Sequence, residues 1–238
     1  MTENSTMTFE TETLQKHMVK CFIWMFLGLA VTALVAYVFI ATGAISEIMF
    51  QATYASGMSL SLVMLLPLFL QLGVVIYLTS RLEKMSVMTS KVLFIVYSIV
   101  TGFTFSFLPA IYGLDNMFLA FGFTAVLFGS LAVIGGTMKL DLTKYSSLIF
   151  GALITLVIIS VVGIFLNIGT LDMIICYAGL FIFLIITAYD VQKIKRNYEY
   201  ARSSSEALEK LSIYGALELY LDFINIFLYV LRILGKKK

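Results

Sequence analysis

Residues 146–167 read SSLIFGALITLVIISVVGIFLN, a run that contains no charged side chain. A helix needs roughly 20 mostly apolar residues to cross a hydrocarbon core of about 30 Å, and this run has that length and composition. It therefore predicts a membrane-spanning helix. Six further stretches have the same character, and they lie at 20–42, 57–79, 91–112, 115–137, 172–192 and 211–234.

The fold class that follows is all-α: a polytopic membrane protein built as a bundle of seven transmembrane helices. Of the 238 residues 61% are hydrophobic and only 13% are charged, and the mean hydropathy is +0.99. A soluble domain needs a polar exterior that this composition cannot supply. The net charge of +2 is too small to indicate nucleic-acid binding.

We expect three segments along the chain. Residues 1–19 form a cytoplasmic N-terminal segment, residues 20–234 form the seven-helix transmembrane domain, and residues 235–238 form a basic C-terminal tail. The polar beginning carries three glutamates, unlike a secretory signal, which begins with basic residues.

Positive charge is concentrated in alternate loops, and this bias predicts the orientation. Twelve of the 16 Lys and Arg residues lie in the N-terminal segment and in loops 2–3, 4–5 and 6–7: Lys16, Lys20, Arg81, Lys84, Lys91, Lys139, Lys144, Lys193, Lys195, Arg196, Arg202 and Lys210. The N-terminus is therefore expected in the cytoplasm. Seven crossings would leave Arg232 and the three terminal lysines outside. Either the tail tolerates its charge there, or the last stretch does not fully cross.

Glycine and proline predict local features of the bundle. A tight turn between the third and fourth stretches is expected at Gly113, and Pro67 and Pro109 are expected to kink their helices. Small residues at helical spacing predict that one face of 115–137 packs closely against a neighbour. These residues are Gly122, Ala125, Gly129, Ala132 and Gly136.

The inventory of cysteine and histidine excludes several kinds of site. Cys21 and Cys176 lie inside apolar stretches, so a disulfide framework is not expected, and neither has a neighbouring histidine to suggest a metal or a nucleophile. The single histidine, His17, precedes the first stretch. Zinc, haem and His-based triads are therefore set aside, and no cofactor is expected.

Two aspartates lie at membrane depth, where an ionisable group costs roughly 2.5–3.5 kcal/mol on insertion scales. They are Asp190 and Asp222. Because 172–192 and 211–234 run in opposite directions, both acids fall in the cytoplasmic half of the bilayer and can meet. In low dielectric two close carboxylates are expected to share a proton. When ionised, they are expected to form an oxygen-lined, transient site for Ca²⁺.

Polar neighbours extend this site along the last stretch. Glu218, four residues before Asp222, and Asn225, three residues after it, are expected to line a pathway on the same helical face. Glu218 at this depth equally fits a side chain that faces headgroup water.

Arg81 ends the second stretch on the cytoplasmic side and is close enough to that surface to reach an acid. Two plainer interpretations stay open. In the first, Asp190 is an interfacial residue paired with Lys193 or Arg81. In the second, Arg81 is an ordinary cytoplasmic anchor of the positive-inside kind.

The run GALELYLDFINIFLYVLRILG at 215–235, together with AYDVQKIK at 188–195, resembles the Bax inhibitor-1 family, also called the transmembrane Bax inhibitor motif family. The resemblance covers nearly the whole chain, and LYLDFIN is its most specific piece. It implies a seven-helix bundle with the last helix at the centre and a proton-sensitive calcium leak. The family's aspartate pair would correspond to Asp190 and Asp222. Its latching arginine would correspond to Arg81, which holds the cytoplasmic end shut by pairing with the first aspartate.

The chain departs from the family pattern in two places. Gln71 stands where some members have an acid in the second stretch, and Glu218 stands where a small or polar residue is commoner. Bacterial members are similar in size, so the expected location is the bacterial plasma (inner) membrane. The expected partners are calcium ions, protons and the lipid bilayer.

Other function classes remain to be weighed. Tyr189–Asp190 resembles the YD motif of intramembrane aspartyl proteases, but the GxGD motif is missing before Asp222 and no histidine lies in the membrane for a rhomboid-type pair. We therefore do not expect an enzyme. A proton-coupled transporter remains an alternative, because buried acids also relay protons. So does a regulator that binds other membrane proteins without transport of its own.

Overall fold

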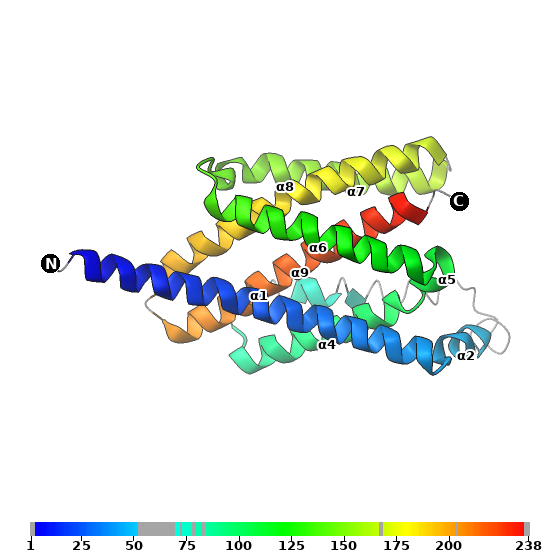
Figure 1. The fold of residues 1–238 in the computed structure, drawn as a ribbon, viewed down its shortest axis with the longest axis horizontal. Coiled ribbons are helices and arrows are strands. Elements are labelled where there is room, and N and C mark those ends of the chain that lie inside the picture. Colours follow the sequence, from blue (N-terminus) through cyan, green and yellow to red (C-terminus); the bar gives the residue numbers. More distant parts are fainter. Residues whose placement is uncertain are drawn as a thin grey trace. The chain divides into compact units, whose positions relative to one another are not determined.

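The computed structural model describes residues 3–51, 70–71, 73–77, 80–81, 84–166, 169–202 and 204–235 (Figure 1). Within these ranges every regular element is a helix, which confirms the all-α fold class. The helices are α1 (Glu3–Ala41), α2 (Ala44–Phe50), α4 (Val87–Phe105), α5 (Leu108–Tyr112), α6 (Leu114–Thr137), the short 3₁₀ turn η2 (Leu142–Tyr145), α7 (Ser146–Leu166), α8 (Gly169–Ala201) and α9 (Ser205–Gly235).

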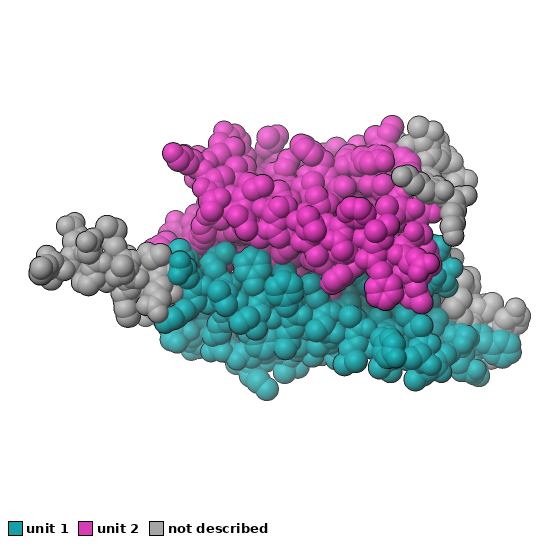
Figure 2. All heavy atoms as spheres, in the orientation of Figure 1, with its two compact units in different colours: residues 1–111, 201–217 teal, residues 112–200, 218–238 magenta. Residues whose placement is uncertain are grey.

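The helices group into two compact units, coloured separately in Figure 2. Unit 1 contains residues 1–111 and 201–217, and unit 2 contains residues 112–200 and 218–238. The beginning of α9 thus belongs to unit 1, and the rest of α9 belongs to unit 2.

Five helical segments of the described chain are long and apolar enough to cross a membrane: Leu14–Ala41, Val87–Tyr112, Leu114–Thr137, Leu142–Ser160 and Asp172–Ala201. The protein is therefore a multi-pass membrane protein. Of the remaining two predicted spans, 57–79 lies mostly outside the described residues, which include only 70–71 and 73–77 of it. The other, 211–234, lies within α9, which is not one of the five segments. The number seven stays a prediction.

The predicted boundaries hold where the apolar run and the helix end together. α6 and α7 begin and end within one residue of the predicted spans 115–137 and 146–167. α1, α8 and α9 run on beyond theirs, and α1 already begins at Glu3, inside the segment expected to precede the first span. Hydropathy marks the apolar part of a helix, whereas Lys, Arg, Glu and Gln continue a helix in water as readily as leucine does.

Both predicted interruptions near residue 110 are confirmed. α4 ends at Phe105 and α5 begins at Leu108, with Pro109 in the first turn of α5, where no backbone N–H is needed. Gly113 joins α5 to α6 with a φ of +78°, a conformation that glycine adopts without steric cost. Pro67, the other predicted kink, lies outside the described residues.

In unit 1, α1 packs closely on α4. A Cβ atom on Gly102 would lie 2.7 Å from the carbonyl oxygen of Thr32, so only glycine fits between the two backbones. The Thr32 hydroxyl donates a hydrogen bond to the carbonyl oxygen of Ser98 at 3.1 Å. Close backbone approach at a small residue is the way helices associate in membranes, where lipid is as apolar as the side chains.

The cytoplasmic ends predicted for unit 1 meet in one cluster around Lys91. Its ammonium lies 2.5 Å from Glu209 and 5.7 Å from the centre of the Trp24 ring, and Lys20 lies 4.0 Å from the same glutamate. The Lys91 hydrogen bond holds the pKa of the Glu209 carboxyl below its usual value, so this carboxyl stays ionised at neutral pH. The start of the apolar part of α1, at Lys20 and Trp24, therefore lies beside the beginnings of α4 and α9, as the charge bias predicts.

In unit 2 the close contact of α6 is not the one predicted. Gly122 and Gly129 have no atom of the described chain within 4 Å of an added Cβ, apart from their own helix and chain neighbours. Instead, a Cβ on Gly135 would lie 2.7 Å from the carbonyl oxygen of Ala188 on α8. The predicted packing face of α6 was wrong, because the sequence shows where small residues lie but not which of them meet a neighbouring helix. The buried residues of α6 are Ala120, Thr124, Phe128 and Gly135.

Candidate functional site

The two aspartates predicted at membrane depth are both buried in unit 2. Asp190 lies on α8 with 7% of its surface exposed, and Asp222 lies on α9 with 2% exposed. Phe223, next to Asp222, packs edge-on against Phe128 and at a tilt against Phe121, with ring centres 5.5 Å away in both pairs. Aromatic side chains of α6 thus pack against the residue that follows Asp222 on α9.

The two carboxyl groups meet, as the antiparallel spacing predicted. The side chains of Asp190 and Asp222 lie within hydrogen-bonding reach of each other, and Thr187 on α8 lies within reach of Asp222. The Thr187 hydroxyl also donates a hydrogen bond to the carbonyl oxygen of Phe183, one turn earlier on α8, at 2.8 Å.

One oxygen of Asp222 is available to an ion or a proton. Within the described chain its Oδ2 is buried and has no hydrogen-bond partner. A buried carboxylate oxygen without a partner is costly, and nearly all such atoms in folded proteins are satisfied. The arrangement is therefore suited to a site that takes up a proton or a cation in the course of its function.

A third carboxylate belongs to the cluster and carries its own counter-ion. Glu218 forms an ion pair with Lys193, and only 12% and 24% of these side chains are exposed. Glu218 is thus not a residue that faces headgroup water. Lys193 forms its ion pair with Glu218 and also attracts the Asp190 carboxylate electrostatically, so the predicted pairing of Asp190 with Lys193 holds in part. Asp190, Asp222 and Glu218 together with this one ammonium leave a formal charge of −2 (three minus one) when all are ionised.

Sequence reasoning missed Thr187, the pairing of Lys193 with Glu218, and one further contact. Thr187 and Lys193 lie three residues before and after Asp190, so helical spacing could have placed them on its face. In unit 1, His17 Nε2 lies 3.9 Å from the sulfur of Cys21, because α1 begins earlier than predicted and sets these residues one turn apart. The expectation that neither cysteine has a histidine neighbour was therefore wrong.

The remaining predicted residues make other contacts or lie in unit 1. Asn225 donates a hydrogen bond to the carbonyl oxygen of Leu221 at 2.8 Å, so its amide is held on α9 itself. In unit 1, Gln71 donates to the hydroxyl of Thr104 at 2.9 Å. Arg81 is exposed and also lies in unit 1. Its link to Asp190 in unit 2 stays a prediction.

The cluster does not have the composition of a resident metal centre. Among the described residues no three or more His, Cys, Asp and Glu side chains are arranged to hold a metal ion. Two aspartates on facing helices, with Glu218 held by Lys193, offer a few hard oxygen ligands where stable calcium sites have six to eight. The chemistry fits brief coordination of a passing cation.

Comparisons with known proteins agree with this architecture. The profile of the Bax1-I family, "Inhibitor of apoptosis-promoting Bax1", matches residues 14–238. The chain is 37% identical over 228 residues to the inner membrane protein YbhL of Escherichia coli K12, which covers 94% of the chain and 93% of YbhL. It is 34% identical over 237 residues to the protein RP147 of Rickettsia prowazekii, which covers 100% of the chain and 96% of RP147. A protein of Borreliella burgdorferi is 35% identical over 223 residues, covering 94% of the chain and 93% of that protein.

Proposed function

Since the chain belongs to the Bax1-I family, whose profile matches it from residue 14 to its last residue, we propose that it is a pH-sensitive leak for Ca²⁺ in the bacterial inner membrane. The observation that supports the proposal is the meeting of two buried aspartates, Asp190 and Asp222, on neighbouring helices of one unit. Carboxylate oxygens are the ligands that Ca²⁺ prefers, and the same oxygens bind protons in competition with it.

The conduction site consists of the aspartate pair, with the neighbouring ion pair as its cytoplasmic border. A cation that reaches Asp222 exchanges some of its water ligands for carboxylate oxygens. Two carboxylates supply too few ligands to hold the cation permanently. Lys193 neutralises Glu218 and so keeps the total negative charge low enough for release. No enzymatic activity and no cofactor enter this proposal.

The test is calcium flux by the purified full chain in liposomes loaded with a calcium-sensitive dye, measured between about pH 5 and pH 8, where coupled carboxylates titrate. We expect flux above that of empty liposomes and a clear dependence on pH. Proton movement without calcium movement would instead support a proton-coupled transporter. Absence of any flux at all pH values would leave only a regulator without transport.

The direction of the pH response follows from the proposed latch between Arg81 and Asp190. A charge-assisted pair between the two holds the cytoplasmic end closed, and protonation of Asp190 removes the attraction. Leak therefore increases as the pH falls.

Arg81→Ala is expected to raise basal flux and to flatten its dependence on pH, because the closed state loses the guanidinium group that pairs with Asp190. The measurement is a double-mutant cycle with Asp190→Asn on the midpoint of the flux–pH curve, since coupled residues give non-additive shifts. Strictly additive shifts would mean that the two residues act separately, and the latch would be abandoned.

We also propose that the N-terminus and loop 6–7 face the cytoplasm, as the charge bias indicates. A cysteine at Ser204, in a chain without Cys21 and Cys176, is expected to resist impermeant thiol reagents in intact cells. Labelling from outside would reverse the orientation. A second cysteine, placed after Lys238, would report the side of the tail by the same reaction.

A further inference from the structure

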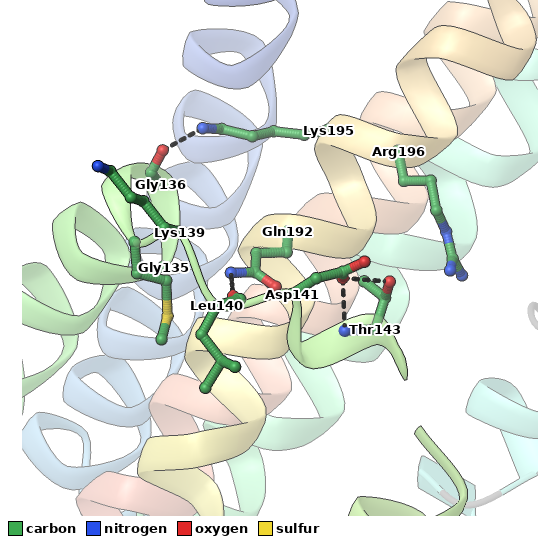
Figure 3. Close-up of a pocket in the computed structure, with 10 residues that line it drawn as sticks. Gly135, Gly136, Lys139, Leu140, Asp141, Thr143, Gln192, Lys195 and Arg196 are labelled. Atoms are coloured by element: carbon green, nitrogen blue, oxygen red, sulfur yellow. Dashed lines mark hydrogen bonds between the residues drawn. The ribbon is translucent and has the colours of Figure 1, made fainter. Parts of the chain in front are cut away.

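A hollow of about 300 Å³ opens in unit 2 where α6 ends and the following loop turns against α8. Figure 3 shows its lining. Three cationic side chains face it, from Lys139, Lys195 and Arg196, and a single carboxylate, from Asp141. The calcium leak proposed above uses none of these residues.

The single carboxylate is already engaged by its own loop. Asp141 accepts hydrogen bonds from the backbone N–H of Thr143 at 3.0 Å and from its hydroxyl at 2.6 Å. The hydroxyl bond, above all, lowers the pKa of Asp141, so the group is an anion at neutral pH. Three cations against one anion leave the lining with a formal charge of +2 (three minus one).

The two lysines lie on one side of the hollow, near the end of α6, and Arg196 lies on the other side, beyond Asp141 (Figure 3). The Lys195 ammonium donates a hydrogen bond to the carbonyl oxygen of Gly136, which occupies one of its three protons. Within the described chain Lys139 has no ion-pair partner, and it is exposed. Both ammonium groups therefore have protons to offer to an anion.

The loop that forms the floor of the hollow is held in place by one side chain. The Gln192 amide donates to the carbonyl oxygen of Leu140 and accepts from the backbone N–H of Leu142, each at 2.8 Å. Gln192 thus fixes the backbone of the loop that carries Lys139, and a fixed backbone reduces the conformational entropy that is lost when a ligand binds.

Its place along the helices indicates which anions it meets. α6 crosses the membrane as Leu114–Thr137, so Lys139 follows the end of a span by two residues and lies at the level of lipid headgroups. Basic pockets between helix ends at this level bind the headgroups of anionic lipids. We propose that the hollow binds a phosphate group at the membrane surface, with Lys139 and Lys195 as the residues that contact it.

A plainer role for the lysines is to stabilise the negative, C-terminal end of the α6 dipole without binding a ligand. The following test distinguishes this role from phosphate binding. The purified full chain is examined by native mass spectrometry and by its unfolding temperature after addition of phosphatidylglycerol, phosphatidylcholine or inorganic phosphate. We expect phosphatidylglycerol to be retained and to raise the unfolding temperature, and phosphatidylcholine to have little effect. If inorganic phosphate raises the unfolding temperature and phosphatidylglycerol does not, the same site binds free phosphate and not a lipid headgroup.

Lys139→Gln tests the proposal without disturbing an internal contact, and the double variant with Lys195→Gln strengthens it. For Lys139→Gln, about ten times more ligand is expected to be needed for the same rise in unfolding temperature. For the double variant, no rise is expected. The matched control is Lys144→Gln, which removes the same charge from the same loop but does not line the hollow. Equal loss in the control and in Lys139→Gln, or equal stabilisation by the neutral lipid, would overturn the proposal.

Discussion

Asp222→Asn protein is expected to fold normally and to lose about nine-tenths or more of its calcium flux. Asparagine keeps the size of the side chain and removes the charge that a passing cation needs. A hydrogen bond or contact to a charged group contributes roughly 1.5–3 kcal/mol, which corresponds to a change of about tenfold or more. The site is buried, and Asp222 Oδ2 has no hydrogen-bond partner in the described chain, so asparagine removes a charged oxygen that was free to bind the cation.

The unfolding temperature of this variant is expected to stay the same or to rise, because the substitution removes a buried charge that lies beside other carboxylates. Asp115→Asn is the matched control, since it is the same chemical change at an exposed aspartate of α6. Flux that is unaltered over the whole pH range in Asp222→Asn, with folding intact, would remove Asp222 from the conduction path.

Gly135→Ala is expected to lower stability by about 1–3 kcal/mol, the usual cost of forcing atoms into a packed interface. The added Cβ would lie 2.7 Å from the carbonyl oxygen and 2.8 Å from the Cα of Ala188, so two helix backbones have to separate. Ala188 precedes Asp190 by two residues. The same displacement is therefore expected to widen the gap between the two aspartates and to alter calcium flux.

Gly129→Ala supplies the control on the same helix, because an added Cβ there meets no described atom within 4 Å beyond its own surroundings. Alanine is the better helix former by about 1 kcal/mol, so this variant is expected to be neutral or slightly stabilised. The measurement is the unfolding temperature of the two variants in the same detergent. Equal values for both would show that the close contact between α6 and α8 does not support the fold.

The fold was predictable where apolar runs and helices coincide. α6 and α7 match their predicted spans because Gly113 and the loop around Asp141 end both the apolar run and the helix. α8 carries on through KIKRNYEYA beyond its apolar part, since these residues form helix in water as well. The face of α6 that packs was not predictable, because Gly129 and Gly135 are the same residue type in similar surroundings and only the neighbouring helix distinguishes them.

The acid pair was predictable from depth and antiparallel order alone, without any knowledge of contacts. Its border was not. Glu218 and Lys193 lie on different helices, and only packing sets the rotation that brings one toward the other. The His17–Cys21 contact was missed for a different reason: the first helix was expected to begin at residue 20, after His17, whereas α1 begins at Glu3.

α8 is a single helix of 33 residues without a proline, so its two ends cannot turn independently. Asp190, Gln192 and Lys195 stand on this one rod within two turns of each other. A rotation that parts Asp190 from Asp222 also pulls the Gln192 amide from the loop, at a cost of roughly 0.5–1.5 kcal/mol for each of its two hydrogen bonds. If the calcium leak and the phosphate site proposed above are both correct, a headgroup bound against the loop opposes this rotation, and the lipid composition of the membrane is expected to change the calcium flux.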